Sequence, residues 1–284
     1  MRCNKPIIIY KNINRMLYPN GMEVPCGKCK ACRIHHRREW TLRMIHELES
    51  WKNAVFITLT YAPEHLPENR SLRKKDLQLY WKRLRKNLNG RKIKYYAVGE
   101  YGDVTDRPHY HAIIYGVGKE DKDILQWSWK FGYIHIGEVT ADSCQYVAQY
   151  VDKKFIWNGV SDYEKENREP IFKTSSLGFG LDFALKNKDS IISNGYIIIN
   201  GVRHSIPRYY IKKYDLPAGY YRDKAEQAEK DLLHHFDPYA DKDSFFDYYA
   251  DGNTIAIHRL LKKYKYDEKL LDRKLKDDYK LRDF

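Results

Sequence analysis

The sequence IKYYAVGEYGDVTDRPHYHAIIYG, residues 93–116, contains the two segments that decide the fold. Residues 93–100 and 109–116 are rich in aromatic and β-branched side chains, which favour strands. The connection between them, YGDVTDRP, is short and contains Gly and Pro, so the chain turns back on itself. We therefore predict two neighbouring antiparallel strands at the centre of the protein.

The flanking sequence alternates between helical and strand patterns. In chain order, the further predicted elements are a helix at 36–52, a strand at 54–63, a helix at 72–88, a helix at about 120–130, a strand at 132–139 and a helix from 142 to about 154. Residues 157–190 are predicted to be mainly loop, and Asn200-Gly201 to be the turn of a hairpin. This order predicts an α+β fold, with helices flanking a central antiparallel β-sheet.

The chain is basic and rich in tyrosine. It has 284 residues, with 51 Lys and Arg against 38 Asp and Glu, which gives a formal net charge of +13. Such an excess favours a polyanionic partner, either nucleic acid or an acidic membrane surface. The 25 tyrosines favour nucleic acid, because a phenol ring can stack on a base.

Several classes of protein are excluded by the sequence pattern. The first residues, MRCNKPIIIYKN, do not form a secretory signal, no run of about 18 apolar residues predicts a membrane span, and no P-loop motif predicts an ATPase. We expect a Cys-rich element at 1–35, a catalytic domain at 36–215 and a charged helical C-terminal extension at 216–284.

His109 and His111 lie two residues apart on one predicted strand. Side chains alternate across a strand, so both imidazoles lie on one face and can bind one divalent ion. Glu100 ends the preceding strand and is brought back beside them; this ligand set suits Mg²⁺ or Mn²⁺ bound to a phosphate oxygen. Asp103 and Asp106 in the connection are alternative carboxylates, and an ordinary strand surface is the alternative to a metal site.

Tyr146, Tyr150 and Lys153 lie on one side of the last predicted helix. At ~100° per residue they fall within ~60° of one another, while Cys144 and Val147 face a predicted core. A phenol is a poor nucleophile near neutral pH, with a pKa around 10. A metal that polarises a phosphate, together with a nearby Lys, would make attack on a phosphodiester feasible. The alternative is that the tyrosines only pack.

Cys26, Cys29 and Cys32 are spaced two residues apart, and Cys3 is available as a fourth thiolate. Four thiolates suit a closed structural Zn²⁺ site that ties the N-terminus to the first helix. His35 is an alternative fourth ligand. The other interpretations are unliganded thiols and an incomplete iron–sulfur run. Cys144 is predicted to be an ordinary core residue.

The segment 72–92 contains nine Lys and Arg and a single acid, Asp76. Such an imbalance favours contact with DNA phosphates, and a solvated helix face is the alternative. The residues predicted to bind DNA are Arg73, Lys74, Lys75, Lys82, Arg83, Arg85 and Lys86.

Four of these motifs occur in the order of a known family. PHYHAIIYG (108–116) resembles the His-hydrophobic-His motif of HUH endonucleases, and FITLTY (56–61) resembles their first motif. YVAQYVDK (146–153) resembles the two-tyrosine motif of rolling-circle replication initiators from single-stranded-DNA phages, the Microviridae. PCGKCKACR (25–33) is most similar to the gokushovirus branch. The resemblance covers roughly residues 1–210.

The resemblance implies an HUH endonuclease-like fold and assigns roles to residues. Tyr146 and Tyr150 would be alternating nucleophiles, Lys153 a catalytic cation, and His109 and His111 metal ligands. Glu100 would be the third ligand. The implied reaction nicks and rejoins single-stranded origin DNA, leaving a 5′-phosphotyrosine link and a 3′-OH primer.

The implied partners are a host helicase and DNA polymerase, and the implied location is the host bacterial cytoplasm, without a membrane. Two other functions are open. A relaxase or transposase would share this site but act on different DNA. A non-enzymatic zinc-containing nucleic-acid-binding protein would use the same histidines and tyrosines only for packing.

Overall fold

The computed structural model describes residues 3, 5–11, 13, 15–16, 19–102, 104–154, 167–199 and 201–216, with the side chains of 151–154 outside that description. Three predictions therefore lie wholly or partly outside the described residues: the alternative ligand Asp103, the Lys153 side chain and the C-terminal helical extension. The chain divides into two compact units, one of which comprises residues 33–214 and the other of which includes residues 1–32. The three predicted domains stay a prediction.

The larger unit is built on an antiparallel sheet, which has five strands among the described residues. Its strand order is β6 (Gly132–Glu138), β3 (Ala54–Tyr61), β5 (Pro108–Tyr115), β4 (Lys94–Tyr101) and β7 (Phe172–Ser175). The two strands from which the prediction started, β4 and β5, are adjacent and pair Glu100 with His109. The predicted α+β fold with a central antiparallel sheet is confirmed.

Helices and short hairpins complete the described part of the chain. The helices are α1 (Lys30–Leu48), α2 (Lys74–Asn87), α3 (Lys122–Ser128), α4 (Ala141–Lys154), α6 (Leu181–Lys186), α7 (Lys188–Asn194), α8 (Arg208–Tyr214) and the 3-10 turns η1 (Pro63–His65), η2 (Glu68–Arg70) and η3 (Lys119–Asp121). The remaining strands form two hairpins, β1 (Ile7–Ile9) with β2 (Met22–Val24) and β8 (Ile197–Ile199) with β9 (Val202–His204).

Two segments differ from the expectation. The first helix begins at Lys30 rather than at residue 36, so its first turn contains the last cysteine of the cluster. Residues 157–190 were expected to be loop, yet β7, α6 and α7 begin within 172–190. These elements span only four to seven residues, which is too short for a hydrophobic period to identify them.

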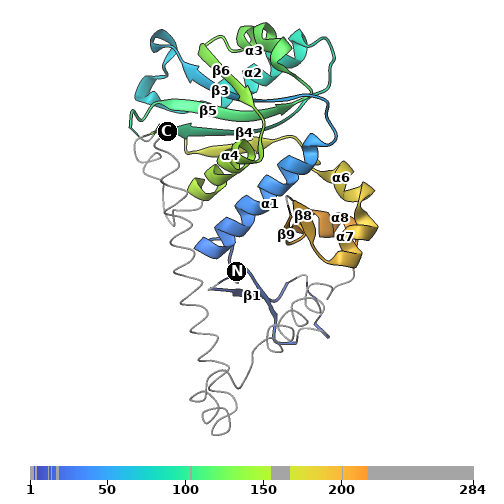
Figure 1. Ribbon diagram of the computed structural model, residues 1–284. Coiled ribbons are helices and arrows are strands. Elements are labelled where there is room, and N and C mark those ends of the chain that lie inside the picture. The colour runs from blue at the N-terminus through green and yellow to red at the C-terminus, as the bar shows by residue number, and fades with distance from the viewer. Residues whose placement is uncertain are drawn as a thin grey trace, which may run out of the picture. The chain divides into compact units, whose positions relative to one another are not determined.

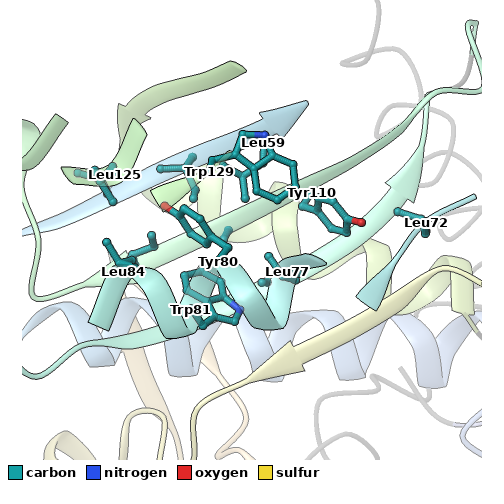
Figure 2. Packing of buried hydrophobic residues seen from close by; sticks show 14 of the residues in the cluster. Leu59, Leu72, Leu77, Tyr80, Trp81, Leu84, Tyr110, Leu125 and Trp129 are labelled. Atoms are coloured by element: carbon teal, nitrogen blue, oxygen red, sulfur yellow. The ribbon is translucent and has the colours of Figure 1, made fainter. Parts of the chain in front are cut away.

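One face of the sheet is sealed by α2 and α3 (Figure 1). Leu77, Tyr80, Trp81 and Leu84 recur at helical spacing on α2, and this side of the helix is buried. Figure 2 shows these side chains against strand residues that include Tyr110. Asn89 and Gly90 follow the helix at positive φ, 50° and 84°, and redirect the chain into β4.

The other face of the sheet is covered by α1 and α4 (Figure 1). Its buried cluster includes Val98, Ile113 and Tyr115 from the strands and Cys144 and Val147 from α4. Alternation along β5 therefore sends Tyr110 to the α2 face and His109 and His111 to the α4 face. The candidate site lies on this second face.

Candidate metal centre and paired tyrosines

Glu100, His109 and His111 form one cluster on the α4 face of the sheet. The Glu100 Oε1 atom lies 2.9 Å from His109 Nε2 and 3.0 Å from His111 Nε2. The strand register brings them together, because Glu100 is directly opposite His109, and opposed residues of an antiparallel pair share a face. Glu100 and His111 are buried, while His109 is half-buried and marks the open side of the cluster.

The second nitrogen of each imidazole contacts an oxygen atom. His109 Nδ1 is 3.1 Å from the Arg107 carbonyl oxygen, and His111 Nδ1 is 2.9 Å from Thr58 Oγ1. A carbonyl can only accept, so His109 carries a hydrogen on Nδ1 and its Nε2 lone pair faces the Glu100 carboxylate. Two acceptors at this distance require a positive charge between them, which is either a proton or a metal ion.

The geometry of this cluster fits a divalent ion. An octahedral Mg²⁺ with bonds of about 2.1 Å holds neighbouring donor atoms about 3 Å apart, and the two Nε2-to-Oε1 distances match this spacing. All three donor atoms lie within 4.8 Å of one another. Nδ1 contacts of this kind orient ligand imidazoles so that Nε2 meets the metal. Two imidazoles and one carboxylate leave further coordination positions for water or a phosphate oxygen.

Tyr146 and Tyr150 of α4 lie over this cluster. The Tyr146 hydroxyl is 3.3 Å from His111 Nε2, and the Tyr150 ring stacks on the His111 ring with centroids 5.8 Å apart. The two phenol rings are edge-on, with centroids 5.2 Å apart. Both tyrosines therefore lie beside the candidate ligands, as their spacing of one helical turn predicted. Tyr150 is buried and Tyr146 is half-buried.

The start of α4 is fixed by a reciprocal cap. The Ser143 N–H donates to Thr140 Oγ1 at 3.2 Å, and the Thr140 N–H donates to Ser143 Oγ at 2.7 Å. From this start, Cys144, Val147 and Ala148 face the sheet and are fully buried. Because these three residues fix the rotation of the helix, Tyr146 and Tyr150 are directed at the histidines.

The environment of Tyr150 disfavours its ionisation. Burial raises the pKa of the Tyr150 phenol well above its usual value, and the Glu100 charge and the neighbouring Tyr146 raise it further. Hydrogen bonds to Tyr146 and Glu100 act in the same direction. Tyr150 is therefore a neutral phenol in the metal-free arrangement.

The other residues predicted for this site have different positions. The Asp106 carboxylate accepts a 2.7 Å hydrogen bond from Arg168 Nη1 and is not part of the ligand cluster. Glu100 is thus the carboxylate that meets the histidines. Lys153 lies in the last turn of α4, and its side chain is outside the described residues.

Two residues beside the histidines were not singled out from the sequence. Thr58 and Phe56 both lie on β3 within FITLTY; Thr58 contacts His111, and the Phe56 ring stacks on the His111 ring at 5.7 Å. Alternation along β3 places them on one face, but only the pairing of β3 with β5 makes it the histidine face.

The four N-terminal cysteines form a second candidate metal site. The Cys26 and Cys32 sulfurs are 4.0 Å apart, and the Cys29 and Cys3 sulfurs are 3.7 Å apart. A tetrahedral Zn²⁺ with bonds of about 2.3 Å separates its sulfur ligands by about 3.8 Å, so the spacing fits. The cluster contains Cys3 and not the alternative ligand His35, which faces Glu39 at 3.7 Å.

Backbone groups prepare Cys26 to be a thiolate. Burial opposes ionisation, but the backbone N–H groups of Lys28 and Cys29 donate to its sulfur at 3.4 and 3.3 Å and lower the Cys26 pKa to about 6. Burial raises the Cys32 pKa, as do the neighbouring thiols. A cation among the four sulfurs would offset this cost of holding several negative charges together. In contrast, burial raises the pKa of Cys144 to about 12, as expected for a core thiol.

The basic residues of α2 lie on the opposite side of the sheet from the histidine cluster (Figure 1). Arg73, Lys74, Lys75, Lys82, Arg85 and Lys86 are exposed. Arg83 is half-buried: its Nε donates to the Ser128 carbonyl at 2.7 Å, and its guanidinium lies over the Phe131 ring. Arg83 therefore connects α2 to α3, whereas the exposed residues form a separate basic surface.

Fold and site together define a class: an antiparallel α+β protein whose sheet presents a Glu/His/His cluster to two tyrosines of one helix. A family model for replication-associated proteins of the ORF2 type matches residues 54–155, which contain both motifs. No solved structure matches the chain significantly. Within the described residues, no helix has the length and apolar character needed to span a membrane.

Three viral proteins are similar over most of this chain. The replication-associated protein VP4 of Bdellovibrio phage phiMH2K is 34% identical over 245 residues, covering 74% of this chain and 76% of that protein. The replication-associated protein ORF2 of Spiroplasma virus 4 is 31% identical, covering 82% and 88%. The replication-associated protein ORF4 of Chlamydia phage 1 is 31% identical, covering 71% and 55%. The chain belongs to the family of replication-associated proteins of Microviridae-like phages.

Proposed function

We propose that the protein is a replication initiator that nicks and rejoins single-stranded DNA at a phage origin by metal-dependent tyrosine transesterification. The observation that carries this proposal is the meeting of Tyr146 and Tyr150 with the Glu100, His109 and His111 cluster. Two candidate nucleophiles beside one candidate ion suit a reaction with two successive attacks. The family membership supports a role in phage replication.

The proposed first step transfers the DNA to a tyrosine. The phenol loses its proton and its oxygen attacks the scissile phosphorus, while the bond from phosphorus to the 3′ oxygen breaks. The released 3′ oxygen takes up a proton and becomes the primer for DNA synthesis. The DNA on the other side is held as a 5′-phosphotyrosine ester. Mg²⁺ or Mn²⁺, when bound by the three ligands, would polarise the phosphate and make phosphorus more open to attack.

The second tyrosine completes the cycle. After one round of synthesis it attacks the regenerated site in the same way, and the newly released 3′-OH attacks the first phosphotyrosine. This restores a phosphodiester bond and returns the first phenol. Each step exchanges one phosphoester for another, so the chemistry consumes no ATP. Lys153 is proposed as the cation that supports the phenolate, on the basis of the family motif.

The proposal includes further components. The four cysteines are proposed to bind a structural Zn²⁺, which metal analysis of the purified protein tests. Origin DNA, a host helicase and a host DNA polymerase are the proposed partners, and the host cytoplasm is the proposed location. The exposed basic residues of α2 are proposed to contact DNA phosphates away from the cleavage site.

Covalent trapping tests the reaction. The protein is incubated with a pool of single-stranded oligonucleotides and Mn²⁺, and protein–DNA adducts are resolved under denaturing conditions. We expect an adduct that requires Mn²⁺ and that is lost in the Tyr146→Phe/Tyr150→Phe double variant, because only the phenolic oxygen can form the ester.

A matched control is the Tyr61→Phe variant, which removes a phenolic hydroxyl from the opposite face of the sheet. It should retain the adduct. Absence of any adduct from the wild-type protein would favour a non-enzymatic nucleic-acid-binding protein. Preference for transfer-origin or transposon-end hairpins over phage-like origin DNA would favour a relaxase or transposase.

A further inference from the structure

The edge strand β6 extends the histidine face of the sheet outward. The register pairs Tyr133 with Thr60, and Thr60 with His109. One row along, His135 pairs with Thr58, and Thr58 with His111. Directly opposed residues of antiparallel strands point to the same face, so Tyr133 and His135 lie on the face of the candidate metal centre. Two strand spacings put them on the order of 10 Å from the histidines.

This part of the face is open. Tyr133 is 66% exposed, and His135 is also exposed. Within the described residues, neither side chain makes a hydrogen bond or ring contact, although the Tyr133 carbonyl accepts from Thr60 Oγ1 at 3.4 Å. The residues between them and the histidines, Thr58 and Thr60, are small and half-exposed. An unobstructed strip therefore leads from the metal centre to two exposed aromatic rings.

Exposed aromatic rings on a sheet are a common way to hold single-stranded nucleic acid. Large aromatic surface is costly to leave in water, and a tyrosine ring can stack on any base. Two aromatic residues at i and i+2 on one strand are about 7 Å apart, and such pairs stack successive bases on the sheets of known RNA-binding domains. The chain's net charge of +13 favours the same ligand.

We infer that Tyr133 and His135 form a stacking site for bases of the single-stranded DNA next to the scissile phosphate. This inference rests on the proposed function, and deepens it by naming how the flanking DNA is held. The two bases would lie flat on the edge strand while the phosphate reaches the Glu100, His109 and His111 cluster. Because stacking is tolerant of base identity, this site would position the strand without selecting its sequence.

Binding and crosslinking test the inference without requiring cleavage. The full chain is mixed with fluorescent oligo(dT) in the presence of EDTA, and affinity is measured by anisotropy. Tyr133→Ala should lower affinity about fivefold or more, the lower limit for loss of one stacked base. Tyr133→Phe should bind like the wild type, since it keeps the ring. His135→Ala should show a smaller loss of affinity.

Photocrosslinking gives a second measurement that does not depend on the variants. Oligo(dT) containing 5-iododeoxyuridine should crosslink to Tyr133 or His135, as mapped by mass spectrometry. The crosslink should persist in the Tyr146→Phe/Tyr150→Phe variant, so loss of nicking with the crosslink intact would count against the proposed reaction alone. Affinity of Tyr133→Ala and His135→Ala within about twofold of wild type, with crosslinks only elsewhere, would overturn the stacking site even if nicking is observed.

Discussion

The sheet carries a pair of tyrosines on each face, and the two pairs are held in different ways. On the α2 face, the Tyr61 and Tyr110 hydroxyls are 2.7 Å apart, and Tyr61 donates to the Asp76 carboxylate at 2.9 Å. Both side chains are buried in the hydrophobic cluster. On the α4 face, Tyr146 and Tyr150 face two imidazoles and a buried carboxylate, and Tyr146 is partly open to solvent.

The comparison shows that a tyrosine pair beside a carboxylate is not by itself a reactive site. The Tyr110 hydroxyl donates to the Arg73 carbonyl and accepts from the Arg73 N–H, both at 2.9 Å, so its hydrogen bonds are satisfied within the protein. Burial raises the pKa of both Tyr61 and Tyr110. Burial also raises the pKa of Tyr150, but that pair has candidate metal ligands and an opening. Access and ligands distinguish the two faces.

The largest effect is expected from removing the metal ligands on the α4 face. His109→Ala/His111→Ala should reduce Mn²⁺-dependent cleavage by at least about 100-fold, because the ion stabilises charge on the phosphate by several kcal/mol. Salt-dependent DNA binding should be largely retained, since most phosphate contacts lie elsewhere. Gel-based cleavage and anisotropy measure the two quantities. Unchanged cleavage in this variant would contradict the metal centre.

Single changes within the reactive pair should have a smaller effect. Tyr146→Phe and Tyr150→Phe should each retain some single-round cleavage, because the neighbouring phenol can still attack. Repeated cleavage and joining should fail in both, since they need two nucleophiles. A plasmid-based replication assay beside a single-turnover assay separates the two outcomes. Full cycles in either single variant would show that one tyrosine is sufficient.

The sealed pair should respond in stability and not in activity. Tyr110→Phe removes a hydroxyl that bonds to Tyr61 and to the Arg73 backbone. Leaving these buried partners unsatisfied should lower the free energy of unfolding by about 1–3 kcal/mol. Urea denaturation measures this loss, and cleavage by the folded protein should match the wild type. Loss of cleavage without loss of stability would remove the distinction between the faces.

A structural histidine provides a pH-dependent counterpart to the metal ligands. His46 of α1 is buried, stacks on Phe183 and lies 2.9 Å from the Tyr210 hydroxyl. Burial lowers the His46 pKa from 6.5 to about 4, and His204 lowers it further. The folded state therefore resists protonation of His46, and its stability contribution is complete above pH 6.5 and is lost as the pH falls toward 4.

The size of this effect is on the order of 2–3 kcal/mol. Urea denaturation of the wild type and of His46→Gln, compared between pH 7 and pH 4.5, separates His46 from the carboxylates, which titrate in both proteins. The variant should be less stable at pH 7 and should lose less stability on acidification. Parallel pH profiles would show that His46 is not the titrating group.

The smallest effect is expected from the basic surface of α2. Replacing the exposed Lys82, Arg85 and Lys86 by Gln should weaken binding of long single-stranded DNA and reduce the salt slope by up to about one per lost contact. Cleavage of a short oligonucleotide should be unchanged, because this surface is on the far face of the sheet. Arg83 is left intact, since its bond to Ser128 supports folding. An unchanged salt slope would indicate a merely solvated surface.

Local patterns in the sequence were sufficient to predict the strands and helices of the site. Alternation placed His109 and His111 on one face, and the one-turn spacing placed Tyr146 and Tyr150 together. The side of the sheet on which α2 packs could not be predicted, because a helix period does not say which face of a sheet it covers. Residue-specific contacts such as that of Thr58 with His111 likewise depend on strand order.

Mapping the covalent adduct on the wild-type protein tests the central claim most directly. The protein is reacted with single-stranded origin DNA and Mn²⁺, digested with nuclease and protease, and the nucleotide-bearing peptide is sequenced by mass spectrometry. We predict a 5′-phosphotyrosine link on Tyr146 or Tyr150, the pair that faces the Glu100, His109 and His111 cluster. A link on any other residue, including Tyr61 or Tyr110 of the sealed face, would contradict the account.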